Sequence, residues 1–136
     1  MTALADYETC PCGNGSAYAN CCKPLHVAGH AGLGTTAEAT MRSRYTAYVI
    51  EDAAYLLATW HNSTRPASID FSEKIEWHGL TVINIAGGAG LDTSGSVEFT
   101  ARFRRGEAHL ELHELSNFVR ENGRWFYVDG IDPVSE

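Results

Sequence analysis

All four cysteines of this 136-residue chain lie between residues 10 and 22, as Cys10, Cys12, Cys21 and Cys22. Cysteines that serve as small core hydrophobes would be scattered through apolar segments. These four instead flank the polar stretch Gly13-Asn14-Gly15-Ser16, whose Asn-Gly pair can reverse the chain direction. Two pairs of soft thiolates joined by such a loop match the tetrahedral coordination of Zn²⁺. The spacing therefore predicts a zinc site.

Disulfide bonds and four unligated thiols are the alternatives to zinc. Disulfides are rare in reducing compartments, and residues 1–8 lack the basic start and apolar run of a signal peptide. The cytoplasm is therefore the expected compartment, and it favours zinc. His26 and His30 are spare ligands, but four thiolates already fill the coordination shell. Because such a shell leaves no open position for water or substrate, we expect a structural ion and no zinc catalysis.

Charge and hydropathy argue against two classes of partner, nucleic acid and membrane. The net charge of −7 argues against broad binding of nucleic acid, which requires basic surfaces to neutralise phosphates. No apolar run approaches the roughly 20 residues that a membrane span requires. The length suits one typical domain, or one small module followed by one globular domain.

The middle of the chain has a helical pattern. Residues 37–61 contain no Gly or Pro and carry apolar residues at helical spacing. Thr35 and Glu38 have the spacing of a capping box and predict the helix start. Glu51-Asp52 predicts a break, which gives two helices of roughly thirteen and nine residues.

The C-terminal half has the alternating pattern of strands. Four strands are expected, near residues 80–85, 97–103, 109–120 and 124–128. Asn122-Gly123 is a strong hairpin signal between the last two strands. Helices followed by an antiparallel meander predict an α+β fold.

The cysteine segment resembles a known motif. The run Cys-Pro-Cys-Gly at residues 10–13, followed by Ser16, Tyr18 and Cys21-Cys22, is similar to the SEC-C zinc motif, named for the C-terminal tail of the SecA translocation ATPase. In that family the last ligand is Cys or His. The resemblance implies that Cys22 takes this position.

The rest of the chain resembles the YchJ-like family of uncharacterised bacterial proteins. The matching stretches are Met41–Tyr48, Tyr55–His61, Trp77–Leu80, Glu114–Phe118 and Gly123–Gly130. This resemblance implies a nuclear transport factor 2-like fold, in which a curved antiparallel sheet wraps around helices to form a cone with a cavity. We therefore expect a zinc knuckle over residues 1–25, a linker over 26–36 and a nuclear transport factor 2-like α+β domain over 37–136. Many relatives have Pro after the residue matching His61, and Asn62 departs from them.

One strand face combines apolar and polar residues. Glu114 and Ser116 share a face with Leu110, Leu112 and Phe118 because side chains alternate along a strand. Glu114 is therefore a candidate pocket acid and general base. The alternative is a structural ion pair between Glu114 and an arginine, Arg42 or Arg44, of the first helix.

Three further residues are candidates for the pocket. Arg44 and Tyr48 lie one helical turn apart and would suit an anionic or aromatic ligand, or else hold the helix to the sheet. His61 is a candidate acid/base partner, or a histidine that merely satisfies the end of the second helix.

These features lead to three hypotheses. The first is a protein-binding adaptor with a structural zinc site, whose partners would be export chaperones or ribosomes by analogy with SecA. The second is a small-molecule binder or an enzyme of isomerase, dehydratase or hydrolase type, with a cavity of roughly 300 Å³ or more. The third is redox sensing through zinc release. The adaptor ranks first, because no acid/base group has the spacing specificity of the cysteines.

Overall fold

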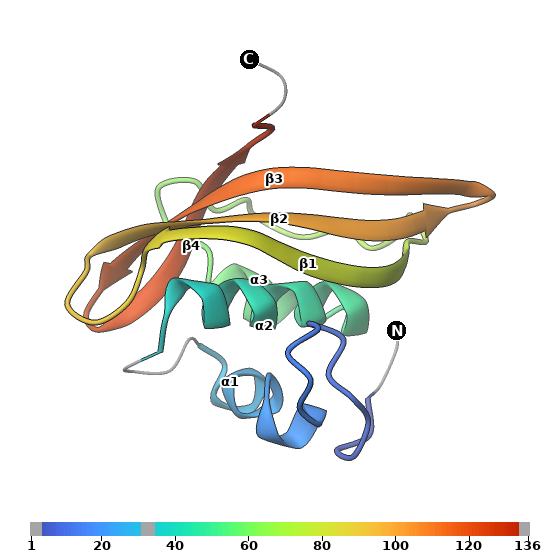
Figure 1. Ribbon diagram of the computed structural model, residues 1–136, viewed down its shortest axis with the longest axis horizontal. Helices are drawn as coiled ribbons and strands as arrows, with labels where there is room; N and C mark the ends of the chain where they lie inside the picture. The colour runs from blue at the N-terminus through green and yellow to red at the C-terminus, as the bar shows by residue number, and fades with distance from the viewer. Residues whose placement is uncertain (1–3, 31–34, 134–136) are drawn as a thin grey trace.

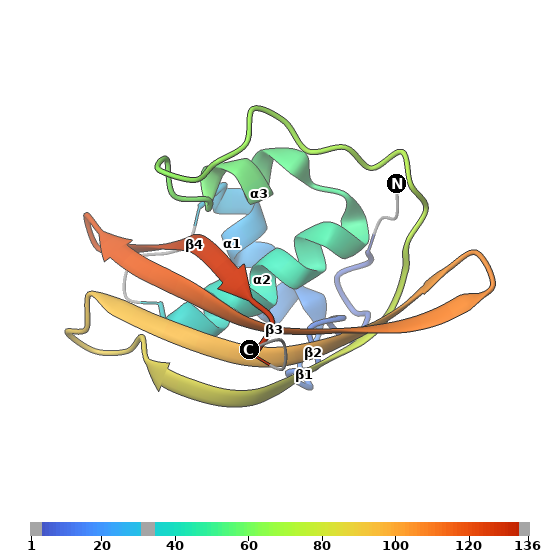
Figure 2. The same cartoon turned by 90° about the horizontal axis from the view of Figure 1, so that it is seen from above.

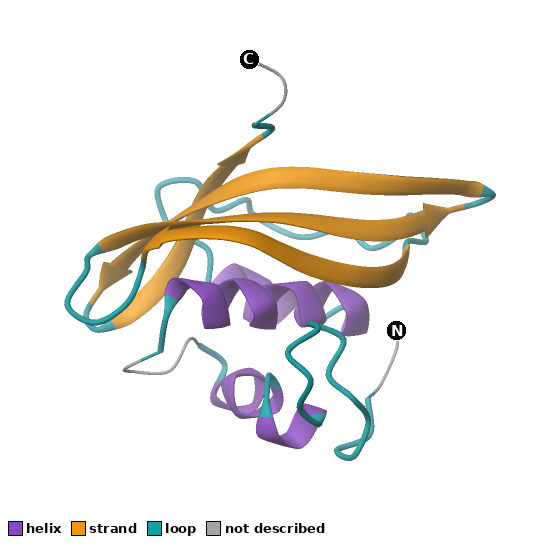
Figure 3. Cartoon of the chain, in the orientation of Figure 1, coloured by secondary structure: helices purple, strands orange, loops and turns teal. Residues whose placement is uncertain are grey.

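A computed structural model describes residues 4–30 and 35–133 of the chain. A four-stranded antiparallel sheet is covered on one face by two helices, and the cysteine segment lies on the far side of the longer helix (Figures 1 and 3). This α+β arrangement confirms the predicted fold class. Residues 31–34 of the predicted linker lie outside the described residues.

The cysteine segment contains two short helical elements. The 3-10 helix η1 covers Tyr18–Asn20, and helix α1 covers Lys23–Ala28. Pro24 stands in the first turn of α1, where its missing N–H is not needed. Gly29 ends α1 with a φ of 80°, a conformation that favours glycine. Helix α1 thus runs across residue 25, where the knuckle is predicted to end.

Helix α2 covers Ala37–Ile50 and begins one residue later than the capping-box prediction implies. Thr36, and not Thr35, is its N-cap, and its hydroxyl accepts a hydrogen bond of 3.0 Å from the backbone N–H of Ala39. Glu38 does not complete a capping box, because its carboxylate accepts a hydrogen bond from Arg42 one turn along the helix.

The predicted break at Glu51-Asp52 is confirmed. Glu51 takes a left-handed conformation with a φ of 59°, and the Asp52 carboxylate then caps helix α3 (Ala53–Ala58) by accepting from the N–H of Tyr55. At 6 residues, α3 is shorter than expected. It ends early because the chain becomes extended and Trp60 pairs with Tyr127 of the sheet.

The sheet is a meander in the order β1-β2-β3-β4. Its strands are β1 (Glu76–Gly87), β2 (Ser94–Arg105), β3 (Ala108–Glu121) and β4 (Arg124–Ile131). Asn122 and Gly123 both have positive φ, at 54° and 77°, as a tight hairpin turn of this kind requires. Seen from above, the sheet curves around α2 and α3 (Figure 2).

The hydrophobic core lies between α2 and the concave face of the sheet. Met41 and Tyr45 of α2 belong to the same buried cluster as Phe99, Phe118 and Trp125 of the strands. Three of the cysteines also belong to this cluster, so the knuckle and the sheet share one continuous core. Among the described helices, none is long and apolar enough to span a membrane.

Replacing the cap residue tests where α2 begins. We expect Thr36→Ala to lower the free energy of unfolding by about 1 kcal/mol, because the N–H of Ala39 loses its acceptor. Thr35→Ala is the matched control and should change stability by less than about 0.5 kcal/mol. Urea unfolding measures the free energy of unfolding of both variants. A larger loss from Thr35→Ala than from Thr36→Ala would contradict the assignment of Thr36 as the N-cap.

Candidate functional site

The four cysteine sulfurs form one compact cluster. All four Sγ atoms lie within 4.8 Å of one another, with 3.4 Å between the sulfurs of Cys12 and Cys21 and 3.9 Å between those of Cys21 and Cys22. None of these distances approaches the roughly 2.05 Å of a disulfide bond. All four are free thiols, and Cys10, Cys12 and Cys22 are buried.

The cluster has the dimensions of a tetrahedral metal site. A Zn–S bond of roughly 2.3 Å gives a tetrahedron with edges of about 3.8 Å. The observed sulfur separations bracket that value. Asn14 donates an N–H to the sulfur of Cys21 at 3.7 Å, the kind of outer contact that orients a ligand. These residues can therefore hold a metal ion.

The sulfurs shift one another's pKa values in opposite directions. Hydrogen bonds from Cys12 and Cys22 lower the pKa of Cys10, whereas the contact with Cys10 raises the pKa of Cys12 to about 12 and also raises that of Cys22. Four adjacent thiolates therefore require a compensating cation. A divalent metal supplies that charge and leaves the thiols deprotonated.

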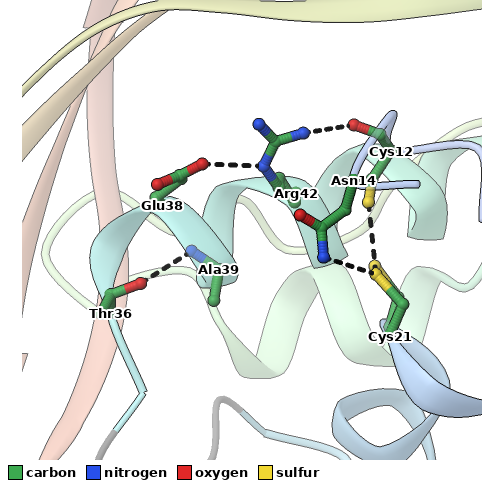
Figure 4. A network of polar contacts seen from close by, with 8 residues as sticks. Cys12, Asn14, Cys21, Thr36, Glu38, Ala39 and Arg42 are labelled. Atoms are coloured by element: carbon green, nitrogen blue, oxygen red, sulfur yellow. Dashed lines mark hydrogen bonds and ion pairs between the residues drawn. The ribbon is translucent and has the colours of Figure 1, made fainter. Parts of the chain in front are cut away.

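Helix α2 holds the cysteine cluster through side chains on its outer face (Figure 4). The Arg42 guanidinium donates a hydrogen bond of 2.6 Å to the carbonyl oxygen of Cys12, while its Nε donates to Glu38. The hydroxyl of Thr46 lies 3.6 Å from the sulfur of Cys10. The cluster is therefore built partly by the helix of the following domain.

His26 joins the knuckle to α2 and is not placed as a ligand. Its Nε2 lies 2.8 Å from the carbonyl oxygen of Ser43, which can only accept, so Nε2 carries the proton there. Its Nδ1 lies 2.8 Å from the hydroxyl of Tyr18. Both ring nitrogens thus have protein partners. Neither His26 nor His30 is among the four metal-competent residues found in the described chain.

On the opposite face of α2 is a cavity of about 300 Å³. Its walls are mostly aromatic and aliphatic and come from α2, Trp60 and all four strands. Its polar lining residues include four of the five predicted pocket candidates: Arg44, Tyr48, Glu114 and Ser116.

Arg44 is buried at one wall of this cavity, with 6% of its surface exposed. Its Nη1 donates hydrogen bonds to the carbonyl oxygen of Leu56 at 2.8 Å and to the Thr59 hydroxyl at 2.7 Å. The guanidinium carbon lies 5.0 Å from the ring centre of Trp60 and 4.6 Å from that of Tyr127. Burial lowers the pKa of Arg44, although a guanidinium stays charged in proteins.

Glu114 does not form the predicted ion pair with Arg42 or Arg44. Among the described residues, neither arginine has an N–O contact to it within 4.0 Å, and the Ser116 hydroxyl instead donates to its carboxylate at 2.7 Å. The carboxyl group also lies against the backbone of Gly130 in β4, so closely that a Cβ there would overlap it. Glu114 is therefore held in a fixed position.

The cavity phenols remain protonated. Burial, followed by the nearby Glu114 carboxylate, raises the pKa of Tyr127. Burial also raises the pKa of Tyr48, despite the opposing effect of Arg44. Both hydroxyl groups are neutral near pH 7 and able to donate or accept hydrogen bonds.

His61 does not line the cavity. Its Nε2 lies 2.9 Å from a carboxylate oxygen of Glu121, and its ring packs edge-on against Phe126. The physical reason is strand parity, because the chain at 60–61 is extended along β4 and successive side chains point to opposite sides. Trp60 therefore faces the cavity beside Tyr127, and His61 faces away from it.

Sequence reasoning missed three residues that line the cavity: Trp60, Trp77 and Tyr127. Both tryptophans are half-buried. Alternation along the last strand would have placed Tyr127 on the same face as the buried Trp125.

A family profile described as YchJ, middle NTF2-like domain, matches residues 36–130. The chain is 46% identical over 121 residues to a UPF0225 protein of Streptomyces coelicolor, an alignment that covers 89% of this chain and 93% of the relative. It is 44% identical over 125 residues to a UPF0225 protein of Chromobacterium violaceum, an alignment that covers 90% of this chain and 91% of the relative.

Two solved structures resemble this one. A SEC-C motif containing protein from Rhodopseudomonas palustris, solved in solution, has a TM-score of 0.78 and 33% identity and covers 91% of this chain and 98% of its own. A sec-c motif containing protein from Psychrobacter arcticus, solved as a crystal, has a TM-score of 0.73 and 27% identity and covers 96% and 84%.

A double-mutant cycle tests the contact between Glu114 and Gly130. We expect Gly130→Ala to destabilise the protein by about 1–3 kcal/mol, because the new methyl group displaces the Glu114 carboxyl group. In a Glu114→Ala background the same change should cost much less, since the clash is gone. Urea unfolding of the two single variants and the double variant measures this coupling. Purely additive effects would contradict it.

Proposed function

We propose that this chain, which belongs to the YchJ-like family, is a small-molecule-binding protein whose ligand site is the cavity between α2 and the sheet. One observation carries the proposal: the cavity has about 300 Å³ of space beside a buried arginine that has no carboxylate partner among the described residues. Ligand sites in proteins are characteristically apolar cavities of this size with a few fixed polar groups.

The polar groups of the cavity are held in place before any ligand arrives. Arg44 is fixed by two hydrogen bonds and two aromatic rings, and Glu114 by Ser116 and the backbone of Gly130. Fixed polar groups favour binding because less side-chain entropy is lost when the ligand docks. Glu114 also remains a candidate general base, so acid–base catalysis would use the same site.

We propose a structural role for the knuckle, with Zn²⁺ held by Cys10, Cys12, Cys21 and Cys22. The ion would stabilise the outer face of α2, whose inner face carries Arg44 and Tyr48 into the cavity. Reduced thiols as zinc ligands suit a reducing compartment such as the cytoplasm.

Docking of a protein partner through the knuckle is the second candidate function. Its specific support is the exposure of two large apolar side chains in this segment, Tyr7 at 85% and Val27 at 75%. Apolar side chains so exposed can anchor a partner protein. Export chaperones and ribosomes remain the partners that the analogy with SecA proposes. Docking through the knuckle ranks second, because Cys10, Cys12 and Cys22 are buried and offer no surface to a partner.

Blocking the cavity mouth tests the ligand-binding function. Leu112 lines the cavity and is 39% exposed, so Leu112→Trp should obstruct entry. A mixture of anionic, neutral and cationic fragments should shift the amide resonances of Ala101 and Ser116 in the wild type, and these shifts should be lost in Leu112→Trp.

Glu111→Trp is the matched control, because residue 111 points to the opposite face of β3 and leaves the cavity open. It should respond to the fragments as the wild type does. If no fragment shifts the cavity amides of the wild type, ligand binding is wrong and docking through the knuckle becomes the leading function.

Metal analysis and thermal unfolding test the knuckle. We expect one zinc per chain in protein purified without chelator, and none in Cys22→Ser. Loss of the ion should lower Tm by about 10 °C and speed hydrogen exchange along α2, because the knuckle and α2 share one core. Asn14→Ala is the control that keeps all four thiols and should retain the metal. Unchanged Tm and exchange in metal-free protein would contradict the proposal.

A further inference from the structure

The cavity contains a buried cation, Arg44, that makes no ion pair among the described residues, although burial, which lowers its pKa, is partly opposed by the attraction of the Glu114 carboxylate in the same wall. No carboxylate lies within 4.0 Å of Arg44 among the described residues. A guanidinium has five N–H donors, and only the two on Nη1 reach protein acceptors in the described chain. The N–H groups of Nε and Nη2 are left for a molecule in the cavity. Burial of a charge is costly unless it is paired, so an anionic ligand would relieve this cost.

The other charged residue that lines the cavity is an acceptor. The Glu114 carboxylate receives one hydrogen bond, from Ser116, and retains capacity for further donors. It makes no ion pair with Arg44, so the two charges occupy separate positions in the cavity wall. The surrounding side chains include Trp77, Phe99 and Phe118, which offer an apolar environment to the body of a ligand.

Together these positions define a class of ligand. On the premise of the proposed function, we infer that the cavity binds a small monocarboxylate with an aromatic or aliphatic body and a hydrogen-bond donor at its other end. The carboxylate pairs with the free N–H groups of Arg44, and the donor, a hydroxyl or an ammonium group, meets Glu114. The planar guanidinium matches the geometry of a carboxylate.

The charges of the cavity also exclude a doubly charged ligand. Arg44 and Glu114 give the cavity lining no net positive charge, so a second negative charge on the ligand would meet the repulsion of Glu114 with no further cation of the lining to offset it. A phosphate monoester is therefore a poor fit. A neutral molecule of the same shape would leave Arg44 without an anionic partner.

Four probes of similar size separate the contributions: 4-hydroxybenzoate, 4-hydroxybenzamide, 4-methylbenzoate and 4-(aminomethyl)benzoate. Calorimetric titration of the full-length wild type should find 4-hydroxybenzoate bound about tenfold more tightly than the uncharged amide, because a hydrogen bond to a charged group is lost. The methyl compound should bind more weakly than the hydroxyl compound. Comparing the affinity of the ammonium compound with that of the hydroxyl compound distinguishes an amino-acid-like ligand from a hydroxy acid.

Two variants assign these preferences to residues. In Arg44→Gln the ratio of acid to amide affinity should fall toward one, since glutamine carries no charge to pair with the carboxylate. Glu114→Gln keeps the size of the side chain and should weaken the ammonium probe most. If Arg44→Gln does not fold, the comparison of acid and amide on the wild type decides alone.

Equal affinity for 4-hydroxybenzoate and its amide would overturn the inference that the ligand is a monocarboxylate. The cavity would still stand as a ligand site. The same holds if other fragments shift the cavity amides while all four probes fail to bind. If neither the probes nor the fragment mixture reaches the cavity, the proposed function itself is wrong. A preference for the acid that survives in folded Arg44→Gln would overturn the role of Arg44.

Discussion

The structure depends on helix α2 being packed on both of its faces. One face meets the cysteine knuckle through Arg42, Thr46 and the His26–Ser43 contact, and the other meets the concave side of the sheet. A helix of this length is marginal in water alone, so its stability comes from these two contacts. The knuckle is likewise too small to fold around its own core. Each part therefore supports the other across the same helix.

The cavity follows from the same packing. Helix α2 presents Arg44 to the sheet side, where the helix α3 end, Trp60 and Tyr127 surround the guanidinium. A leucine at position 44 would satisfy an ordinary core, whereas a buried guanidinium costs several kcal/mol of desolvation that its contacts must offset. The sheet is held apart from the helix around this group, and space remains for a ligand.

Local patterns in the sequence are sufficient for much of this architecture. The helix break at Glu51-Asp52 and the turn at Asn122-Gly123 depend on neighbouring residues, and both were predictable. The orientation of His61 was not, because it depends on a pairing with Tyr127 that is remote in sequence. The separate positions of Arg44 and Glu114 could not be predicted from the sequence either. Charge pairing alone would join them, whereas in the structure Glu114 accepts from Ser116 and lies against Gly130.

Because β4 is the last strand of the chain and contributes to the cavity wall, the cavity can close only late in folding. As the chain is synthesised from its N-terminus, the thiols and α2 emerge first, and the knuckle can assemble on the helix through contacts that are near in sequence. Tyr127 and Gly130 arrive with the last strand, so Arg44 and Glu114 stay hydrated until then. Closure of the cavity is thus a late, non-local step, of the kind that slows folding and exposes apolar surface to chaperones.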